Sequence, residues 1–548
     1  MTRKQTSVTT VLTLVIIALC LLVSRQIWFR VDITRDRLNT VSAVSRNLHT
    51  EIRDTVQITY FISDRLRGIS PIPGEIEDFL REYVGFSRGR MRLTVRDPAR
   101  ADMTRAIEQL GILPQQIQTF DQGELSIVTV YSGIVIEYLD EVSVMPVVFS
   151  LETLEYDMTS RIRAMVRGTP RIVGIIVGDP NPRRWEESYR HLHGTFIQAG
   201  YQVRFFNPGE YIPDTISALM VLDGVEVLDD PALFQIDRYI QAGGRALFTV
   251  RAVEVDIFGT MDARLRHDRG LLEMLASYGV MVHPEIVMDQ TPLSMPIQVR
   301  SPGGFLMTQL VRNFQWIRLL PENGNPSHPA TSMFAGLDLF WANPISVAPP
   351  EGVVGEYLFT TTGEAWTMRE PFLTNPDFAA LMERDAHLTA GRRVLGASLS
   401  GVFPSWFDGP GGRGVPEHWA SELPPMPEQP RPARIIVIGE SEFATALINV
   451  TGGHHNLNFI IQATDWLGHD DDIIGIRSRT AGSGRLDRIA DPVARVAAMR
   501  FSRTINVFVM PVLVILAGVF ISFRRTHARN AAASGSNSGS GTDSGGGE

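Results

Sequence analysis

The sequence predicts an α/β protein whose soluble part lies between two hydrophobic segments. Apolar runs of β type alternate with amphipathic helical runs over most of the chain, which is the pattern of α/β domains. An apolar segment stands near each end, within residues 7–29 and 505–523. The 548 residues are 44% hydrophobic and 20% charged, as in ordinary globular proteins, and their number suffices for about three domains of ~150 residues each.

Residues 1–29 are predicted to form an uncleaved N-terminal transmembrane anchor. A helix of about 20 apolar residues crosses the ~30 Å hydrocarbon core of a bilayer. Arg3 and Lys4 precede the apolar run, which predicts a cytoplasmic N-terminus. A cleaved signal peptide is the alternative, but no small-x-small cleavage site follows the run. A lipoprotein signal would need a small residue before Cys20, where Leu19 stands.

Residues 30–168 are predicted to form the first soluble domain. Alternation and helical spacing predict the order strand, helix, strand, helix, strands with a hairpin, and helix, over residues 56–63, 74–87, 91–98, 101–111, 125–149 and 152–167. This order is that of a thioredoxin-like domain. The one cysteine of the chain is Cys20, so this domain would lack redox cysteines.

Residues 169–485 are predicted to form a larger α/β domain with a parallel sheet. Buried-looking strands alternate with helices over residues 171–178, 202–207, 218–224, 230–242 and 245–250. The alternation is lost over residues 290–432, which are rich in Gly, Pro and Trp and predict a long insertion with strands of its own. Regular structure returns with strands at 434–443 and 473–479 and a helix at 456–468.

The C-terminal part of the chain is predicted to return to the membrane. Residues 486–504 would form a juxtamembrane segment and 505–523 a transmembrane helix, with a buried core helix as the alternative. Arg524 and Arg525 follow at once, which predicts a cytoplasmic C-terminus. Residues 524–548 end in a Gly/Ser-rich tail predicted to be disordered. The soluble domains would then lie on the periplasmic or extracytoplasmic side of a two-pass protein of the cytoplasmic membrane.

Composition excludes several function classes. Lys4 is the only lysine, so no Walker A loop exists and ATP hydrolysis would require a separate subunit. A net charge of −9 argues against nucleic-acid binding. A single cysteine excludes internal disulfides and cysteine zinc sites. We expect no cofactor.

Several segments, taken in order, resemble the gliding-motility ABC-transporter auxiliary family (GldG-like). The segment "VDITRDRLNTVS" (31–42) is similar to the entry motif that follows the first span in that family. The segments at 131–148, 154–167, 173–179, 235–250 and 434–479, and the closing "INVFVMPVLVILAGVFISFRR", are similar to its later signatures. The resemblance covers residues 30–525 and is weakest over 290–432.

The resemblance implies a non-catalytic auxiliary subunit of an ABC-2-type transport complex. Its partners would be a separate multi-span permease and a separate ATP-binding subunit, and its extracytoplasmic domain would couple them to a substrate or envelope partner. Gliding itself is not implied. Two alternatives stay open: a membrane-anchored envelope hydrolase, suggested by the glutamine-amidotransferase-like look of the α/β domain, and an extracytoplasmic solute-binding receptor.

No catalytic, cofactor-binding or metal residue is predicted, although several candidates arise. Ser441 in "GESEF" suggests a nucleophile elbow, but Phe443 stands where that motif has glycine. His191 and His193 would not share a helix face, and Asp97 and Asp179 end strands at an edge where α/β sheets bind ligands. The remaining candidates are His454, His455 and Asp470, Asp471 and Asp472. These residues could ligate a metal ion or could belong to solvated turns.

A cluster of aromatic residues in the irregular middle suggests a partner surface, because exposed aromatic side chains favour interfaces. These residues are Phe403, Trp406, Phe407 and Trp419. Packing of the insertion against the sheet is the alternative.

Overall fold

The computed structural model describes residues 41–476, apart from a set of short gaps and one longer one. These gaps are residues 101–102, 122–123, 152, 179–186, 224–226, 258, 268, 301–303, 376–389, 409–412, 417–418, 420–422, 469–472 and 474–475. Within the described ranges, no helix is both long and apolar enough to cross a membrane. Both predicted spans, the juxtamembrane segment and the Gly/Ser tail lie outside those ranges.

The first folded body contains a four-stranded sheet of order β2-β1-β5-β6. Its strands are β1 (Val56–Ile62), β2 (Met91–Arg96), β5 (Ser132–Tyr138) and β6 (Glu141–Met145). β1 pairs in parallel with β2 and antiparallel with β5, which also pairs antiparallel with β6. The predicted order of strands and helices is therefore observed, with the pair β3 (Gln115–Asp121) and β4 (Glu124–Val130) added before β5.

The helices of this body follow the expected apolar spacing. They are α2 (Ala43–Asn47), α3 (Asp64–Ile69), α4 (Ile72–Gly85), α5 (Thr104–Gln109) and α6 (Leu154–Arg167). In α4, Ile76, Leu80 and Tyr83 are buried, one turn apart, on the side that packs against the strands. Helix α6 ends at Gly168, whose φ of 64° is the left-handed conformation typical of a helix C-terminus.

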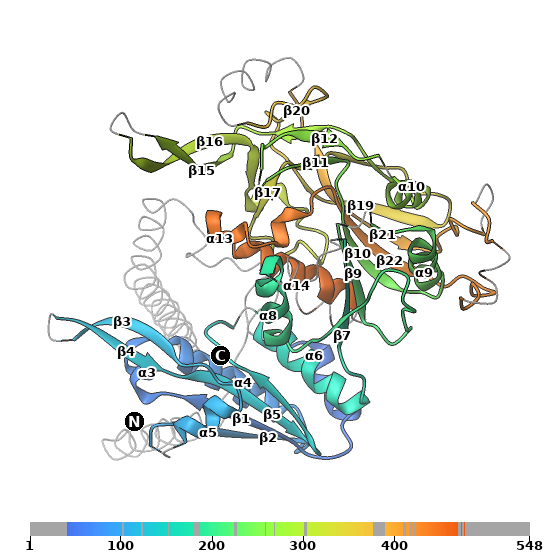
Figure 1. Cartoon of the computed structure of the whole chain (residues 1–548). Coiled ribbons are helices and arrows are strands. Elements are labelled where there is room, and N and C mark those ends of the chain that lie inside the picture. Colours follow the sequence, from blue (N-terminus) through green and yellow to red (C-terminus); the bar gives the residue numbers. More distant parts are fainter. Residues whose placement is uncertain are drawn as a thin grey trace, which may run out of the picture. The chain divides into compact units, whose positions relative to one another are not determined.

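The second body is built on a seven-stranded sheet of order β19-β21-β22-β10-β9-β7-β8 (Figure 1). Its parallel strands are β7 (Ile172–Val177), β8 (Gln202–Phe205), β9 (Ala218–Leu222), β10 (Arg245–Thr249) and β22 (Ala433–Ile438). Every residue of β9 is buried. Leu219 and Val221 lie in one hydrophobic core of this domain, the first core, and Met220 and Leu222 lie in another, the second core. Burial on both faces is the reason that β7, β9, β10 and β22 read as continuous apolar runs, whereas the edge strand β8 is mostly exposed.

Helices cover both faces of this sheet (Figure 1). Side chains of α9 (Asp230–Gln241) and α10 (Gly270–Ser277) lie in the first core, and those of α8 (Arg190–Gln198) and α14 (His455–Gly468) in the second. Helix α9 begins where the Asp229 carboxylate accepts a hydrogen bond from the Ala232 amide at 3.1 Å.

The segment 290–432 contributes two strands to this main sheet, which corrects the expectation of a purely parallel sheet. β21 (Val394–Gly401) pairs antiparallel with β22, and β19 (Val353–Thr360) pairs antiparallel with β21. Ala397 and Leu399 of β21 pack into the first core and Leu395 into the second, so both faces of the added strand gain apolar cover. The sheet is therefore mixed, because β21 runs antiparallel to its neighbours β22 and β19.

The remaining strands of the larger domain form smaller sheets of two or three strands. They are β11 (Val253–Val255), β12 (Ala263–Leu265), β13 (Val280–Val282), β14 (Ile286–Met288), β15 (Pro292–Arg300), β16 (Leu306–Leu319), β17 (Leu337–Phe340), β18 (Ile345–Val347) and β20 (Trp366–Met368). A short helix, α13 (Ile448–Thr451), and the 3-10 turns η1 (Leu48–Thr50), η2 (Pro321–Asn323) and η4 (Glu442–Ala444) complete the described elements.

The strand predicted at 473–479 is wrong at the two of its residues that the structure describes. Ile473 and Ile476 are helical and buried. They stand three residues apart, so one helical turn places both on the same face, whereas a strand would place them on opposite faces.

The buried imidazole of His328 supports a pH test of this fold. Its Nδ1 accepts from the Ala330 amide at 3.1 Å, so the proton lies on Nε2, 3.0 Å from Ser398 Oγ. Burial, aided by Arg434, lowers its pKa to about 4. In the unfolded state His328 binds a proton below about pH 6.5, whereas in the folded state it does so only below about pH 4. The free energy of unfolding therefore decreases as the pH falls from about 6.5 to about 4.

We predict that His328→Gln removes this loss. The variant's deficit in unfolding free energy at pH 7 should shrink by about 2 kcal/mol at pH 5. Urea unfolding of both proteins at the two pH values measures this. An equal deficit at both values would show that His328 does not titrate as described.

Candidate functional site

A cavity of about 780 Å³ lies at the carboxyl ends of the parallel strands. Val177 ends β7 and Gly178 follows it, and beside them Leu222 ends β9 and Asp223 follows it. The chain leaves β7 toward β8 on one side and reaches β9 on the other, so the cavity stands where the strand order reverses. Open α/β sheets commonly bind ligands at this position.

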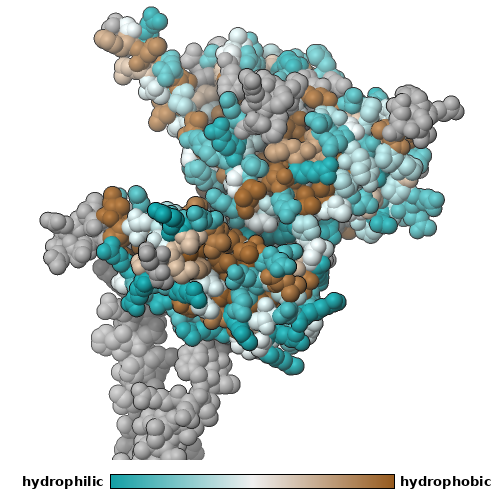
Figure 2. Space-filling view, turned by 60° about the horizontal axis from the view of Figure 1, so that its bottom comes forward, coloured by the Kyte–Doolittle hydropathy of each residue, from teal (hydrophilic) through white to brown (hydrophobic). Residues whose placement is uncertain are grey.

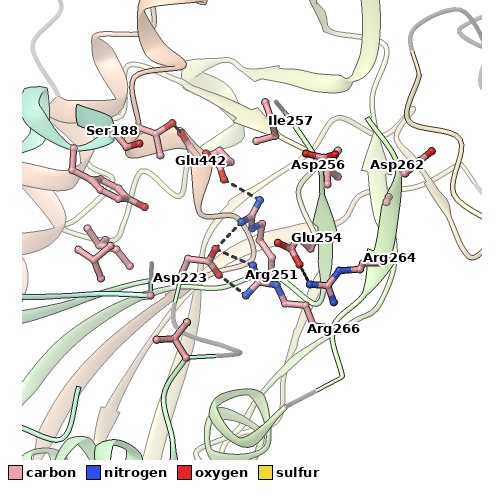
Figure 3. Close-up of a pocket in the computed structure, with 18 of the residues that line it drawn as sticks. Ser188, Asp223, Arg251, Glu254, Asp256, Ile257, Asp262, Arg264, Arg266 and Glu442 are labelled. Atoms are coloured by element: carbon pink, nitrogen blue, oxygen red, sulfur yellow. Dashed lines mark hydrogen bonds and ion pairs between the residues drawn. The ribbon is translucent and has the colours of Figure 1, made fainter. Parts of the chain in front are cut away.

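Arg251 fixes the floor of the cavity by joining residues from three strand ends. Its Nη2 lies 2.6 Å from Asp223 Oδ2, after β9, and its Nη1 lies 2.9 Å from Glu442 Oε1, after β22. Arg266, from the far side of the β11–β12 pair, places Nη1 2.9 Å from Asp223 Oδ1. Figure 3 shows Arg251 between the two carboxylates, with Arg266 on Asp223.

Backbone geometry helps to aim Asp223 into this cluster. The residue has a φ of 53°, a left-handed conformation that Asp tolerates better than most residues. Its amide donates to the Thr249 carbonyl at 2.9 Å, so the turn is tied to the end of β10. The sequence therefore turns out of the sheet directly at the carboxylate.

Asp223 and Arg251 are charged at neutral pH. Burial works to raise the pKa of Asp223, but Arg251 and Arg266 hold it below its ordinary value. Burial works to lower the pKa of Arg251, but Asp223 and Glu442 raise it above its ordinary value. The neighbouring Glu440 differs, because burial and then the charge of Glu442 raise its pKa well above the usual range.

The β11–β12 pair forms a polar wall opposite the strand ends (Figure 3). Asp256 accepts from the Thr260 amide at 3.0 Å, and Asp262 from the Thr260 hydroxyl at 2.6 Å. Five carboxylates face three guanidinium groups around the cavity, a formal balance of −2. They are Asp223, Glu254, Asp256, Asp262 and Glu442, against Arg251, Arg264 and Arg266. The cavity therefore favours neutral polar or cationic groups over anions.

Ser441 is not placed as a nucleophile. It is 1% exposed, and in the described part of the chain its hydroxyl has no hydrogen-bond partner. An activated serine needs a general base within hydrogen-bond reach. The serine is instead part of the turn in which Glu440 accepts from the amides of Glu442 and Phe443, at 2.6 and 2.7 Å.

The candidate histidines are not brought together. His191 contacts Asn449 at 3.0 Å, the ring of His193 faces Phe205, and His455 Nε2 lies 3.3 Å from Asp338 Oδ1. Among the residues that the structure describes, no group of three or more His, Cys, Asp or Glu side chains could hold a metal ion.

Of the candidate aspartates, only Asp97 is among the residues that the structure describes. Asp97 accepts from the Ala99 amide at 3.0 Å, as a turn residue does. Asp179, Asp470, Asp471 and Asp472 lie outside the described residues.

The predicted aromatic partner surface is corrected, because its residues pack into the first core of the main sheet. Phe403 and Phe407 are each 2% exposed and Trp419 8%, and Trp406 is half-buried against them. Phe234 of α9 meets the rings of Phe407 and Trp419 at 5.4 and 5.7 Å between centroids. These side chains therefore follow the alternative interpretation, in which the insertion packs against the sheet.

A buried carboxylate holds this segment on α9. Asp237 accepts from the Ser405 hydroxyl at 2.8 Å and from the amides of Trp406 and Phe407 at 2.9 and 3.2 Å. Three donors on adjacent residues fix the loop and turn its aromatic rings inward.

The fold and the site define an α/β domain with a polar cavity at the carboxyl edge of its sheet. The chain belongs to the family of auxiliary components described as an ABC-type uncharacterized transport system, which it matches over residues 170–462. Residues 35–137 match a domain of unknown function. An uncharacterized protein of Borreliella burgdorferi is 22% identical over 514 residues, covering 92% of this chain and 94% of that protein.

Solved structures show only distant similarity. The N-terminal domain of mmIFT52 aligns with a TM-score of 0.31 and 11% identity, covering 55% of this chain and 98% of that one. A putative thua-like protein from Parabacteroides merdae gives 0.26 and 12%, covering 55% and 90%. At these TM-scores neither similarity bears on function.

Arg251→Met should destabilise the protein by about 3–5 kcal/mol, because it removes the guanidinium group between two largely buried carboxylates, leaving Glu442 without this partner and Asp223 with Arg266 alone. Arg264→Met is the matched control: the Arg264 side chain is 52% exposed in its pair with Glu254, and such pairs contribute about 0–1 kcal/mol. Urea unfolding at pH 7 compares the two. Similar small losses for both would show that the Arg251 cluster does not fix the strand ends.

Phe407→Ala tests the burial of the aromatic cluster. Removing a buried Phe side chain should cost about 3–5 kcal/mol. Tyr357→Ala, at a residue 51% exposed on β19, should change stability by no more than about 0.5 kcal/mol. Thermal unfolding of the two variants gives the comparison, and an unaffected Phe407→Ala variant would restore the partner-surface interpretation.

Proposed function

We propose that this chain is a non-catalytic auxiliary subunit of an ABC-2-type transport complex, similar to the gliding-motility auxiliary proteins. Its partners are a separate permease and a separate ATP-binding subunit. The observation that carries the proposal is the family match over residues 170–462, which spans the whole cavity-bearing sheet. The single lysine, Lys4, agrees with it, since the chain has no Walker A loop.

In this proposal the chain is anchored by helices within residues 7–29 and 505–523, with both termini in the cytoplasm. Residues 30–168 form a thioredoxin-like domain, a proposal supported by the strand order β2-β1-β5-β6 with β5 antiparallel to β1. Residues 169–485 form the larger α/β domain. Both lie on the extracytoplasmic side and couple the transporter to a substrate or an envelope partner.

The cavity favours a binding role over a hydrolytic one. Its guanidinium groups are held by carboxylates, and the one serine suggested as a nucleophile is buried away from any base. Arg251, Asp223 and Glu442 provide fixed hydrogen-bonding groups that need no rearrangement when a ligand binds. A solute-receptor role within the transport complex is therefore the second candidate that the cavity supports.

Co-purification is the direct test. The full chain, tagged at its C-terminus and solubilised in mild detergent, should bring down a multi-span permease and an ATP-binding protein in fixed ratio. A tagged two-span membrane protein of unrelated function is the matched control. Recovery of neither subunit under conditions that keep known ABC complexes intact would overturn the proposal.

A further inference from the structure

The strands β15 and β16 form an arm that extends beyond the body of the second domain (Figure 1). The two strands pair antiparallel from Leu293↔Asn313 to Arg300↔Leu306. The inner part of β16, residues 314–319, is almost entirely buried, whereas residues 306–310 are exposed. The outer half of the arm therefore has no cover from its own chain within the described ranges.

The free end of the arm is apolar. Phe305 is 76% exposed, Leu306 67%, Met307 56% and Leu310 68%. Single exposed apolar side chains are normal in soluble proteins, but four large ones within six residues form a patch that needs an explanation. Figure 2 shows apolar residues gathered at the end of this projection, at the upper left.

The arm is also basic in an acidic protein. Between Asp289 and Glu322 the sequence contains Arg300, Arg312 and Arg318 but no acidic residue, although the whole chain carries −9. Arg318 is neutralised by Asp338 at 2.7 Å. In the part of the chain that the structure describes, neither Arg300 nor Arg312 has an acidic partner, and both lie beside the apolar end.

The geometry argues against a protein partner for this end. On the β15 edge of the arm, Pro292 and Pro296 lack the N–H groups that strand addition requires. The opposite edge, on β16, pairs with β17 only over residues 316–319, so the small area of the tip is the main reason against a protein partner. A stable protein interface buries about 800 Å² on each partner, which is more than the tip of one hairpin offers. A bilayer surface needs only a few inserted apolar side chains with basic groups beside them.

We propose that the β15–β16 arm docks on the surface of an anionic lipid bilayer. Phe305, Leu306, Met307 and Leu310 insert at the boundary between headgroups and acyl chains. Arg300 and Arg312 contact lipid phosphates. This inference goes beyond the proposed transport role and rests on the arm's own chemistry.

The test uses the full chain in proteoliposomes with a dye on the arm. Cys20→Ser removes the only native cysteine, and Thr308→Cys places an environment-sensitive dye among the apolar residues without removing any of them. Vesicles of phosphatidylglycerol and phosphatidylcholine should shift the dye emission to the blue. Brominated acyl chains in these vesicles should quench the dye. Both the blue shift and the quenching should be smaller in vesicles of phosphatidylcholine alone. Soluble glycerophosphate, which has the headgroup chemistry without a bilayer, should neither reproduce nor block the effect.

Phe305→Ser with Leu310→Ser should abolish the quenching, and Arg300→Glu with Arg312→Glu should abolish its dependence on anionic lipid. Val354→Ser with Tyr357→Ser is the matched control, because these apolar side chains of β19 are 61% and 51% exposed. All the altered side chains are exposed, so unfolding temperatures should be unchanged. The control variant should keep full quenching.

Three results would overturn the proposal. They are an unquenched dye in every vesicle, quenching that survives the Phe305 and Leu310 changes, and a blue shift without quenching that grows with protein concentration, which would identify a second copy as the partner. Resistance of the unlabelled chain to alkaline extraction reports separately on the predicted anchors, so failure of the arm and failure of the anchoring are distinguishable.

Discussion

The structure of the larger domain depends on one buried arginine. Arg251 leaves the end of β10 and binds carboxylates that follow β9 and β22, so three adjacent strand ends are held at one point. Arg266 adds a second guanidinium to Asp223 and joins the β11–β12 pair to the same cluster. Because breaking a buried ion pair leaves an uncompensated charge, the cluster fixes both the sheet edge and the polar wall of the cavity.

This constraint also explains the chemistry that the edge offers. Carboxylates and guanidinium groups that are already paired keep their charges and their positions, which suits recognition of a polar ligand. Nucleophilic catalysis needs a mobile proton between a base and a nucleophile, and Ser441 and Glu440 are buried apart from such an arrangement. The chain belongs to the family of ABC-type transport-system auxiliary components, and within such a system we propose the receptor role for this cavity.

The alternation of strands and helices was predictable because β7, β9, β10 and β22 are buried on both faces and read as continuous apolar runs. The antiparallel β21 was not, since its partner β22 lies more than thirty residues away and nothing local specifies that pairing. Asp223 lies near the end of the strand expected at 218–224, and Arg251 follows the strand expected at 245–250, so both were accessible to sequence reasoning. The approach of Arg266 depends on the β11–β12 pairing, which was not predicted from the sequence. The aromatic residues near Trp406 illustrate a general ambiguity: composition alone does not distinguish an interface from a core.

In the proposed topology, both soluble domains lie on the far side of the membrane from the ATP-binding subunit. Labelling by a membrane-impermeant maleimide in intact cells tests this most directly, in a Cys20→Ser background with Glu356→Cys on an exposed strand or Ser534→Cys in the tail. We expect the first cysteine to react from outside and the second to react only after the cells are opened. Protection of residue 356 in intact cells with labelling after lysis would contradict it.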